Sequence, residues 1–336
     1  MLCANKIYND FFSLRDPMIF LFIGGQSGAG KTSLSQALKD EYQDDAVIIN
    51  MDDYFKERPE GRDAKEYRLN TIFDTPEMLD LEKLFEQLSA LKNNIPINKP
   101  IFNFESNRSK GTEKVNPTQV IIVEGIFAQY FYKHYVESKN WPALSINTVT
   151  ESYTDIINSR CLRDQVYRGL SRAEVLYNER HYVAPGFFKY TASCTPESHI
   201  YANAPRVDFG KQLSTMPVEA IKALLANSQE KITAALKTTV EEIKEAIAER
   251  RNTSAQLDTD ANSSNHPKDW GQILVRKSHE EYNRSINERT PELLFCGLFD
   301  SYSPGCKAVL KIRSQNEKTL STTSEDNFDL AQSSTI

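Results

Sequence analysis

One eight-residue segment constrains the fold of this chain more than any other. Residues 25–32 read Gly-Gln-Ser-Gly-Ala-Gly-Lys-Thr, which satisfies the pattern GxxxxGK[ST] of a phosphate-binding loop. At average residue frequencies, a chain of 336 residues shows this pattern by chance on the order of once in a hundred cases. The pattern needs a strand before it and a helix after it, so it predicts the first unit of a parallel α/β sheet.

The residues around this loop have the required periodicity. A compact apolar run at residues 18–23 leads in, and residues 31–42 read as a helix. Backbone N–H groups of such a loop point at phosphate oxygens, and the helix adds its positive end. An ordinary glycine-rich turn would not require Lys-Thr after the last glycine. We therefore expect a nucleoside triphosphate on Gly25, Gln26, Ser27, Gly28, Ala29, Gly30, Lys31, Thr32 and Ser33.

Strand-like and helix-like segments alternate through the first two hundred residues. Further apolar runs lie at residues 46–50, 120–123 and 144–149, and helical spacing recurs at 75–91, 127–136 and 152–168. Thr75 can cap the helix at 75–91, and Pro76 fits its first position. This alternation predicts an α/β fold, a parallel sheet flanked by helices, at residues 17–210.

The C-terminal part has a different character and predicts a mainly helical extension. A long amphipathic helix is expected within residues 211–250, either docked on the first domain or paired with a partner helix; the pattern favours docking. Residues 251–268 read as a polar linker, 269–312 as a small region with one helix, and 313–336 as a disordered tail. The helices offer a surface for self-association or for a protein partner.

Composition limits the other partners and the compartment. The formal net charge of −6 disfavours a nucleic-acid partner. The apolar run at 18–23 is too short to span a membrane, so no membrane partner is expected. The 5 cysteines include no CxxC pair, which indicates a reducing compartment. We expect a cytoplasmic protein.

Carboxylates follow two of the apolar runs. Glu124 comes at the end of the run at 120–123, where a P-loop enzyme places a carboxylate that supports Mg²⁺ together with the hydroxyl of Thr32. Asp52 and Asp53 follow the run at 46–50, and either could accept a proton from a substrate hydroxyl. The pattern does not choose between these two; a solvated turn or a surface glutamate is the plain alternative.

Three arginines share the segment predicted as a helix at 152–168. Arg160, Arg163 and Arg168 span an arc of roughly 140° at 100° per residue, so one face could present all three. Positive groups on a mobile segment neutralise charge that develops in phosphoryl transfer. A solvated basic face balanced by Asp164 and Glu174 is the competing interpretation, and it is favoured for arginines taken in isolation.

Six segments together resemble the uridine kinase and phosphoribulokinase family of P-loop kinases. They are residues 24–32 (GGQSGAGKT), 51–55 (MDDYF), 73–76 (FDTP), 100–104 (PIFNF), 123–126 (VEGI) and 160–169 (RCLRDQVYRG). Their order and spacing agree with the family over about residues 17–205, which is more specific than any one motif.

The resemblance implies a role for each matching residue. It makes Asp52 the catalytic aspartate, with Lys31, Arg163 and Arg168 acting on the transferred phosphoryl group, and it makes Thr32 and Glu124 the Mg²⁺ ligands. It implies that ATP and Mg²⁺ are the cofactors. The substrate-binding residues that it implies are Asp52, Phe55, Asp74, Phe102, Asn107, Arg160 and Arg163.

The resemblance implies an ATP-dependent kinase that phosphorylates a small-molecule hydroxyl, first the 5′-hydroxyl of uridine or cytidine. Two positions depart from the family: Phe102 replaces a tyrosine and Asn107 replaces a histidine that recognise the base. These departures motivate an alternative acceptor: a sugar phosphate, a vitamin-like alcohol or an atypical nucleoside. The C-terminal extension motivates another, a non-catalytic nucleotide-binding interaction module.

Overall fold

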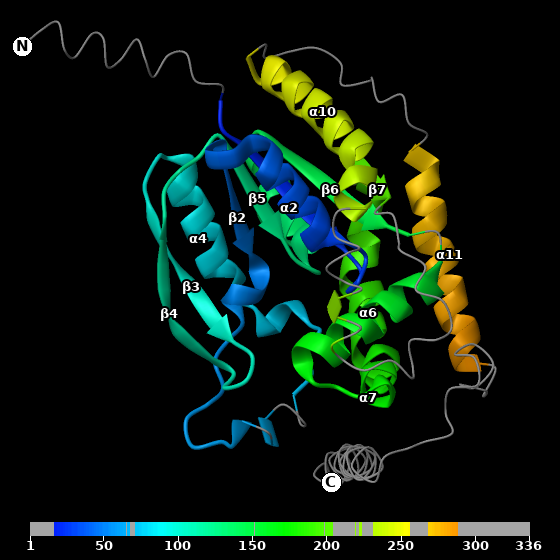
Figure 1. The fold of residues 1–336 in the computed structure, drawn as a ribbon. Coiled ribbons are helices and arrows are strands. Elements are labelled where there is room, and N and C mark those ends of the chain that lie inside the picture. The colour runs from blue at the N-terminus through cyan, green and yellow to red at the C-terminus, as the bar shows by residue number, and fades with distance from the viewer. Residues whose placement is uncertain are drawn as a thin grey trace, which may run out of the picture.

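The computed structural model describes residues 17–64, 66–67, 71–150, 152–197, 199–203, 219, 222–223, 231–255 and 268–287. Five strands form its central sheet: β1 (Ile19–Gly25), β2 (Ala46–Asn50), β5 (Val120–Glu124), β6 (Ala143–Val149) and β7 (Ile200–Asn203). They run parallel in the order β2-β5-β1-β6-β7 (Figure 1). The predicted α/β class is confirmed.

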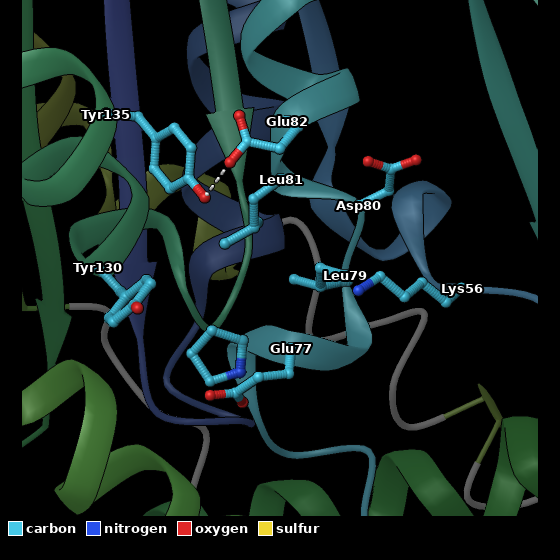
Figure 2. A pocket seen from close by; sticks show the side chains of 9 residues that line it. Lys56, Glu77, Leu79, Asp80, Leu81, Glu82, Tyr130 and Tyr135 are labelled. Atoms are coloured by element: carbon cyan, nitrogen blue, oxygen red, sulfur yellow. Dashed lines mark hydrogen bonds between the residues drawn. The ribbon is translucent and has the colours of Figure 1, made fainter.

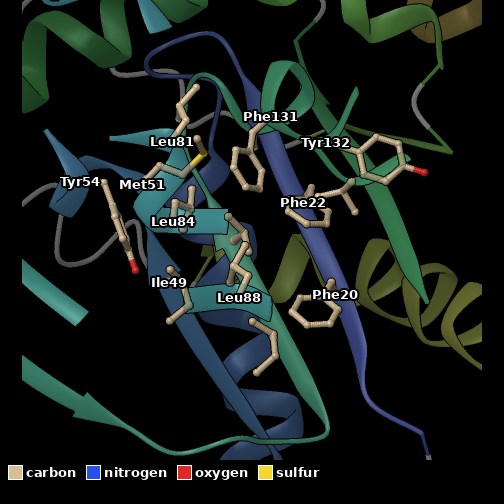
Figure 3. Close-up of a cluster of buried hydrophobic side chains, with 14 of the residues drawn as sticks. Phe20, Phe22, Ile49, Met51, Tyr54, Leu81, Leu84, Leu88, Phe131 and Tyr132 are labelled. Carbon is tan, nitrogen blue, oxygen red and sulfur yellow. The ribbon is translucent and has the colours of Figure 1, made fainter. Parts of the chain in front are cut away.

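Helices cover both faces of this sheet because the central strands are apolar on both sides. Along β1, Phe20 and Phe22 pack with α4 (Leu81–Lys92) and α5 (Ala128–Phe131) on one face (Figure 3). Ile19, Leu21 and Ile23 pack with α2 (Lys31–Tyr42) and α10 (Lys237–Ala255) on the other. Successive side chains of a strand point to opposite faces, so one continuous apolar run supplies two cores.

A third hydrophobic cluster lies beyond the sheet. It joins α6 (Tyr153–Arg168), α7 (Arg172–Asn178) and α11 (Lys268–Asn287). Beside the sheet, β3 (Ile97–Asn103) and β4 (Arg108–Val115) form an antiparallel hairpin. The short helical turns are η1 (Gln43–Asp45), η2 (Met51–Tyr54), η3 (Pro76–Met78), η4 (Tyr132–Val136), η5 (Glu137–Lys139), η6 (Glu179–Val183), α8 (Ala184–Gly186), η7 (Phe187–Thr191) and η8 (Ala192–Glu197).

The helix expected at residues 75–91 begins later than predicted. Thr75 precedes only the short turn η3 and caps nothing with its side chain, whereas the carboxylate of Asp80 accepts from Lys83 N at 3.1 Å and caps α4. Between them the backbone pairs with another segment: Lys56 N donates to Met78 O at 2.8 Å. These hydrogen bonds to another segment occupy backbone N–H and C=O groups that a continuous helix would pair internally. The α-helix therefore begins only after them.

The C-terminal extension is part of the core. Leu236, Val240, Ile243 and Ile247 are buried with the sheet face that carries α2, so the helix is docked within the chain. α10 continues to Ala255 because no glycine or proline interrupts residues 251–255, and α11 begins directly after Pro267. The expected linker is therefore shorter at both ends.

The other expectations for the extension lie largely outside the described residues. These are the first part of the long helix, the linker at 256–267, and everything after residue 287, including the predicted tail. No helix in the described part of the chain is long and apolar enough to cross a membrane.

Replacing Ile243 with alanine tests whether α10 contributes to the core. The truncation leaves a cavity under the sheet, so we expect a loss of about 2–4 kcal/mol in the free energy of unfolding, measured by urea denaturation. Glu245→Ala, an exposed position on the same helix, is the matched control and should change stability by about 0.5 kcal/mol or less. Equal stability of the two variants would contradict a docked α10.

Candidate functional site

The phosphate loop is shaped by backbone conformations that glycine allows. Gly25, Gly28 and Gly30 have φ values of 133°, 91° and 89°, in the left-handed region. A Cβ atom on Gly28 would lie 3.0 Å from the carbonyl oxygen of Ile156 and 3.3 Å from Cβ of Arg160. Glycine at this position therefore lets the loop lie directly against α6. No side chain caps the N-terminus of α2, so its N–H groups are left for an anion.

Of two loop side chains, Lys31 bonds within the phosphate loop and Thr32 connects the loop to the end of β5. Lys31, mostly buried, donates from Nζ to the carbonyl oxygen of Gln26 at 3.0 Å. Thr32 Oγ1 donates to Glu124 Oε1 at 3.3 Å, across from the end of β5. Burial raises the pKa of the Glu124 carboxyl, and Lys31 acts in the opposite direction. A buried carboxylate beside a hydroxyl oxygen is a donor set that suits Mg²⁺.

The structure gives Asp52 and Asp53 different surroundings. Asp53 forms an ion pair with Lys99 and accepts from Phe102 N at 3.2 Å, so it anchors the β3–β4 hairpin. Asp52 lies within electrostatic reach of Lys31 in the phosphate loop and of Arg163 and Arg168 on α6. Burial raises the pKa of the Asp52 carboxyl. Arg168, Lys31 and Arg163 act in the opposite direction, and only charges close to the carboxylate can do so.

Asp74 lies on the same side of the site. Burial raises the pKa of its carboxyl to about 6; Arg160 opposes this shift, and Glu179 adds to it. Gly186 packs against it so closely that a Cβ there would come within 2.1 Å of the Asp74 carbonyl oxygen. The backbone of residue 74 is therefore held between the turn before α4 and the helical turns that follow α7.

One buried carboxylate organises the three arginines. Asp164 Oδ1 lies 2.8 Å from Arg163 Nε and 3.5 Å from Arg168 Nε, and Oδ2 lies 3.3 Å from Arg160 Nε. Burial opposes ionisation of Asp164, but Arg163 and Arg168 outweigh it, and its pKa stays below the ordinary value.

The arginines then diverge. Arg163 Nη2 donates to Ser27 Oγ of the phosphate loop at 3.1 Å. The guanidinium of Arg168 stands 5.9 Å from the ring centroid of Phe104, on the hairpin. Arg160 is buried and also pairs with Glu179. Its charge is therefore balanced within the protein, whereas Arg163 and Arg168 point toward the loop and the hairpin.

An aromatic wall, defined by Phe55, Phe73, Phe102 and Phe104, contacts this cluster where Arg168 approaches Phe104. Phe55 contacts the other three rings with centroid separations of 5.9, 5.7 and 5.8 Å. Phe102 is buried in the wall, while Phe104 is 46% exposed. The wall can stack on a planar or apolar part of a ligand, but none of its rings carries a hydrogen-bonding group.

Asn107 has a local structural contact. It is 1% exposed, has a φ of 50°, and donates from Nδ2 to the carbonyl oxygen of Ala64 at 3.4 Å. The backbone carbonyl oxygen of Asn107 accepts from the backbone N of Arg58 at 2.9 Å. The residue therefore connects the hairpin to the segment after η2. Its predicted part in acceptor binding stays a prediction.

A separate hollow opens at the start of α4, with a volume of about 200 Å³. Figure 2 shows it between Lys56, the turn at Glu77 and the rings of Tyr130 and Tyr135. Some of its polar groups already have partners: Tyr135 donates to Glu82 Oε1 at 3.0 Å, and Asp80 caps α4. It includes none of the predicted site residues.

Four contributors to the site were not among the predicted site residues: Phe73, Phe104, Asp164 and Glu179. Phe104 lies in the turn that follows β3, and its ring contacts that of Phe102 with centroids 5.2 Å apart, so strand periodicity does not identify it. Glu179 lies in the turn η6 after α7 and carries no motif; only the fold brings it to Arg160. Among the described residues, no cluster of three or more His, Cys, Asp or Glu side chains could hold a metal ion by itself.

Residues 20–208 match the sequence model of the Phosphoribulokinase / Uridine kinase family. A uridine kinase of Chlamydia pneumoniae is 40% identical over 111 residues, which are 32% of this chain and 49% of that protein. A uridine kinase of Schizosaccharomyces pombe is 32% identical over 171 residues, which are 50% of this chain and 36% of that protein. The chain thus spans half or less of the length of these two relatives.

One solved structure, D-glycerate 3-kinase from Cryptococcus neoformans var. grubii, superposes with a TM-score of 0.39 at 12% identity. The superposition covers 58% of this chain and 89% of that chain.

Asp74→Asn should stabilise the protein without ligands. Because the folded pKa of about 6 lies above the ordinary value of 3.8, the unfolded chain loses this proton first, and stability falls as pH rises between these values. At about pH 7.5 we expect a gain of about 1–3 kcal/mol in the free energy of unfolding, which shrinks as pH falls toward about 5. Asp44→Asn, an exposed control, should give no such pH-dependent gain. A less stable Asp74→Asn variant at pH 7.5 would contradict the shift.

Proposed function

The chain belongs to the phosphoribulokinase and uridine kinase family, and we propose that it transfers the γ-phosphate of ATP to a hydroxyl group of a small molecule. The observation that carries this proposal is a phosphate loop bonded through Thr32 to Glu124 and through Ser27 to Arg163, with Asp52 close enough for Lys31, Arg163 and Arg168 to act on its carboxylate. A base, a phosphate-binding loop and mobile positive charge are what phosphoryl transfer to an alcohol requires. A non-catalytic nucleotide-binding module would have no need of Asp52 in this position.

The proposed mechanism assigns the donor to the phosphate loop. Backbone N–H groups of the loop and the start of α2 hold the phosphates, and Lys31 leaves its carbonyl partner to reach the β- and γ-oxygens. Thr32 and Glu124 would hold Mg²⁺, which neutralises charge on those oxygens. The buried Glu124 carboxylate has a raised pKa, so a cation beside it would relieve the cost of its ionisation.

Asp52 and the arginines act on the transferred group. The acceptor hydroxyl oxygen attacks the γ-phosphorus, the bond to the β,γ-bridging oxygen breaks, and ADP leaves with the electron pair. Asp52 takes the hydroxyl proton, which its upward-shifted pKa favours. Arg163 and Arg168 neutralise the charge on the phosphoryl oxygens. Asp74 would accept hydrogen bonds from further hydroxyls of the acceptor.

The acceptor proposed first is the 5′-hydroxyl of uridine or cytidine, in line with the activity named for the relatives. The aromatic wall could stack on the base. A second candidate is an acceptor of another class, a sugar phosphate, a vitamin-like alcohol or an atypical nucleoside. This second candidate is favoured because the wall offers little with which to recognise a base by hydrogen bonds. Phe102 has no polar side-chain group, and the side-chain amide of Asn107 donates to the backbone carbonyl of Ala64.

The variant pair Asp52→Asn and Asp53→Asn tests the assignment of the base. Asp52→Asn should lower kcat by about 10²–10⁴-fold, because it removes the proton acceptor. Asp53→Asn, the matched neighbour, loses the contact to Lys99 and should lower stability by about 1–3 kcal/mol, with a smaller loss of kcat. Full phosphorylation of every accepted substrate by Asp52→Asn would sink the mechanism.

A panel of acceptors tests the substrate. ATP consumption is measured with uridine, cytidine, other nucleosides, ribulose 5-phosphate, pantothenate and nicotinamide riboside. We expect the highest kcat/KM with uridine or cytidine. Turnover of these two alone would remove the second candidate, and turnover of another compound without them would replace the first.

A further inference from the structure

The order of the strands indicates in which direction a bound ATP molecule would extend across the sheet. Asp52 follows β2, at one edge of the sheet, and β7 forms the other edge. The phosphate loop follows β1, in the middle. If the γ-phosphate faces Asp52, the rest of the nucleotide extends away from β2, over the carboxyl ends of β6 and β7. Ligands of open α/β sheets bind outside these strand ends, where the strand order reverses.

Helix α11 lies on that side of the molecule. It contacts α6, β6 and β7, and runs beside α6 in Figure 1. It belongs to the extension beyond residue 208, where the family match ends. Tyr282 of α11 packs on Tyr153 and Phe188, with ring centroids 6.1 and 5.3 Å apart, which fixes the helix on the start of α6.

Two polar side chains of α11 contact the elements that handle phosphate. Ser278 Oγ donates to Gln26 Oε1 of the phosphate loop at 2.9 Å, and both residues are 6% exposed. Glu281 Oε2 accepts from the backbone N of Tyr153 at 2.9 Å, at the first residue of α6. The helix therefore bridges the loop and the helix that carries Arg163.

The side-chain amide of Gln26 is only partly satisfied. Its oxygen accepts from Ser278, but its Nε2 group is buried and has no hydrogen-bond partner among the described residues. Buried donors in folded proteins almost always have an acceptor. With the oxygen fixed by Ser278, the N–H groups are the end of the amide left for a ligand that brings an acceptor.

We infer that α11 forms part of the donor-nucleotide site: Ser278 orients the Gln26 amide so that its N–H group donates to bound ATP, and Glu281 fixes α11 to the first residue of α6. Ser278 is a positioning residue, since it acts through Gln26. The inference rests on the proposed function for the identity of the donor. It adds that affinity for ATP depends on a helix outside the family-matched domain.

The test measures equilibrium binding of ATP to the full chain, with no acceptor present. Ser278→Ala should weaken ATP binding about threefold to tenfold, the worth of one oriented hydrogen bond. Glu281→Gln should also weaken it. Glu280→Gln, an exposed neighbour with the same change of charge, is the matched control and should bind ATP like the parent chain.

A double-mutant cycle separates positioning from a general loss of structure. If Ser278 acts through Gln26, then Ser278→Ala should cause no further loss of ATP affinity in a Gln26→Ala background. Undiminished loss in that background, or a lowered Tm with unchanged ATP affinity, would overturn the inference. Failure of the parent chain itself to bind ATP would instead overturn the proposed function.

Discussion

Asp164 binds three guanidinium groups that would otherwise repel one another. Its side chain is fully buried together with that of Arg160, so water screens their ion pair little, whereas Arg163 and Arg168 are partly exposed and their ion pairs are screened more. Because these arginines are anchored at their Nε atoms, their Nη atoms remain free to point elsewhere. Arg163 reaches the phosphate loop and Arg168 reaches the hairpin. Through these two arginines, one carboxylate links the phosphate loop to the hairpin that carries Phe104.

The two sides of the site are built differently. The phosphate loop is fixed mainly by its backbone: positive φ angles, contact of Gly28 with α6, and hydrogen bonds within the loop. The acceptor side is fixed by side chains, with Asp53 anchoring the hairpin and Phe55 at the centre of the aromatic wall. A loop fixed by its backbone suits phosphate groups, which many enzymes bind. A site fixed by side chains can change its proposed acceptor by substitution of those side chains.

Sequence patterns predicted the parts of the structure that depend on local order. The buried strands and the phosphate loop follow from apolar runs and from a motif whose chemistry is backbone chemistry. The start of α4 was misjudged because long-range backbone pairing of residues 54–56 overrides the cap signal at Thr75. The fifth strand, β7, is short and carries a polar residue at its end, so periodicity did not reveal it.

The roles of individual site residues were predicted less evenly. The residue pattern alone shows two adjacent aspartates; the family resemblance selects Asp52, and the hairpin gives the physical difference, because Asp53 pairs with Lys99. It shows three arginines on one helix, but not that Arg160 is neutralised by Glu179. The contact of Ser278 with Gln26 joins residues 252 positions apart and leaves no local pattern.

The docked α10 adds a consequence for synthesis. The part of the apolar face of β1, β5 and β6 that α10 covers stays exposed until residues 236–247 have left the ribosome, although α2 can cover the rest of the face earlier.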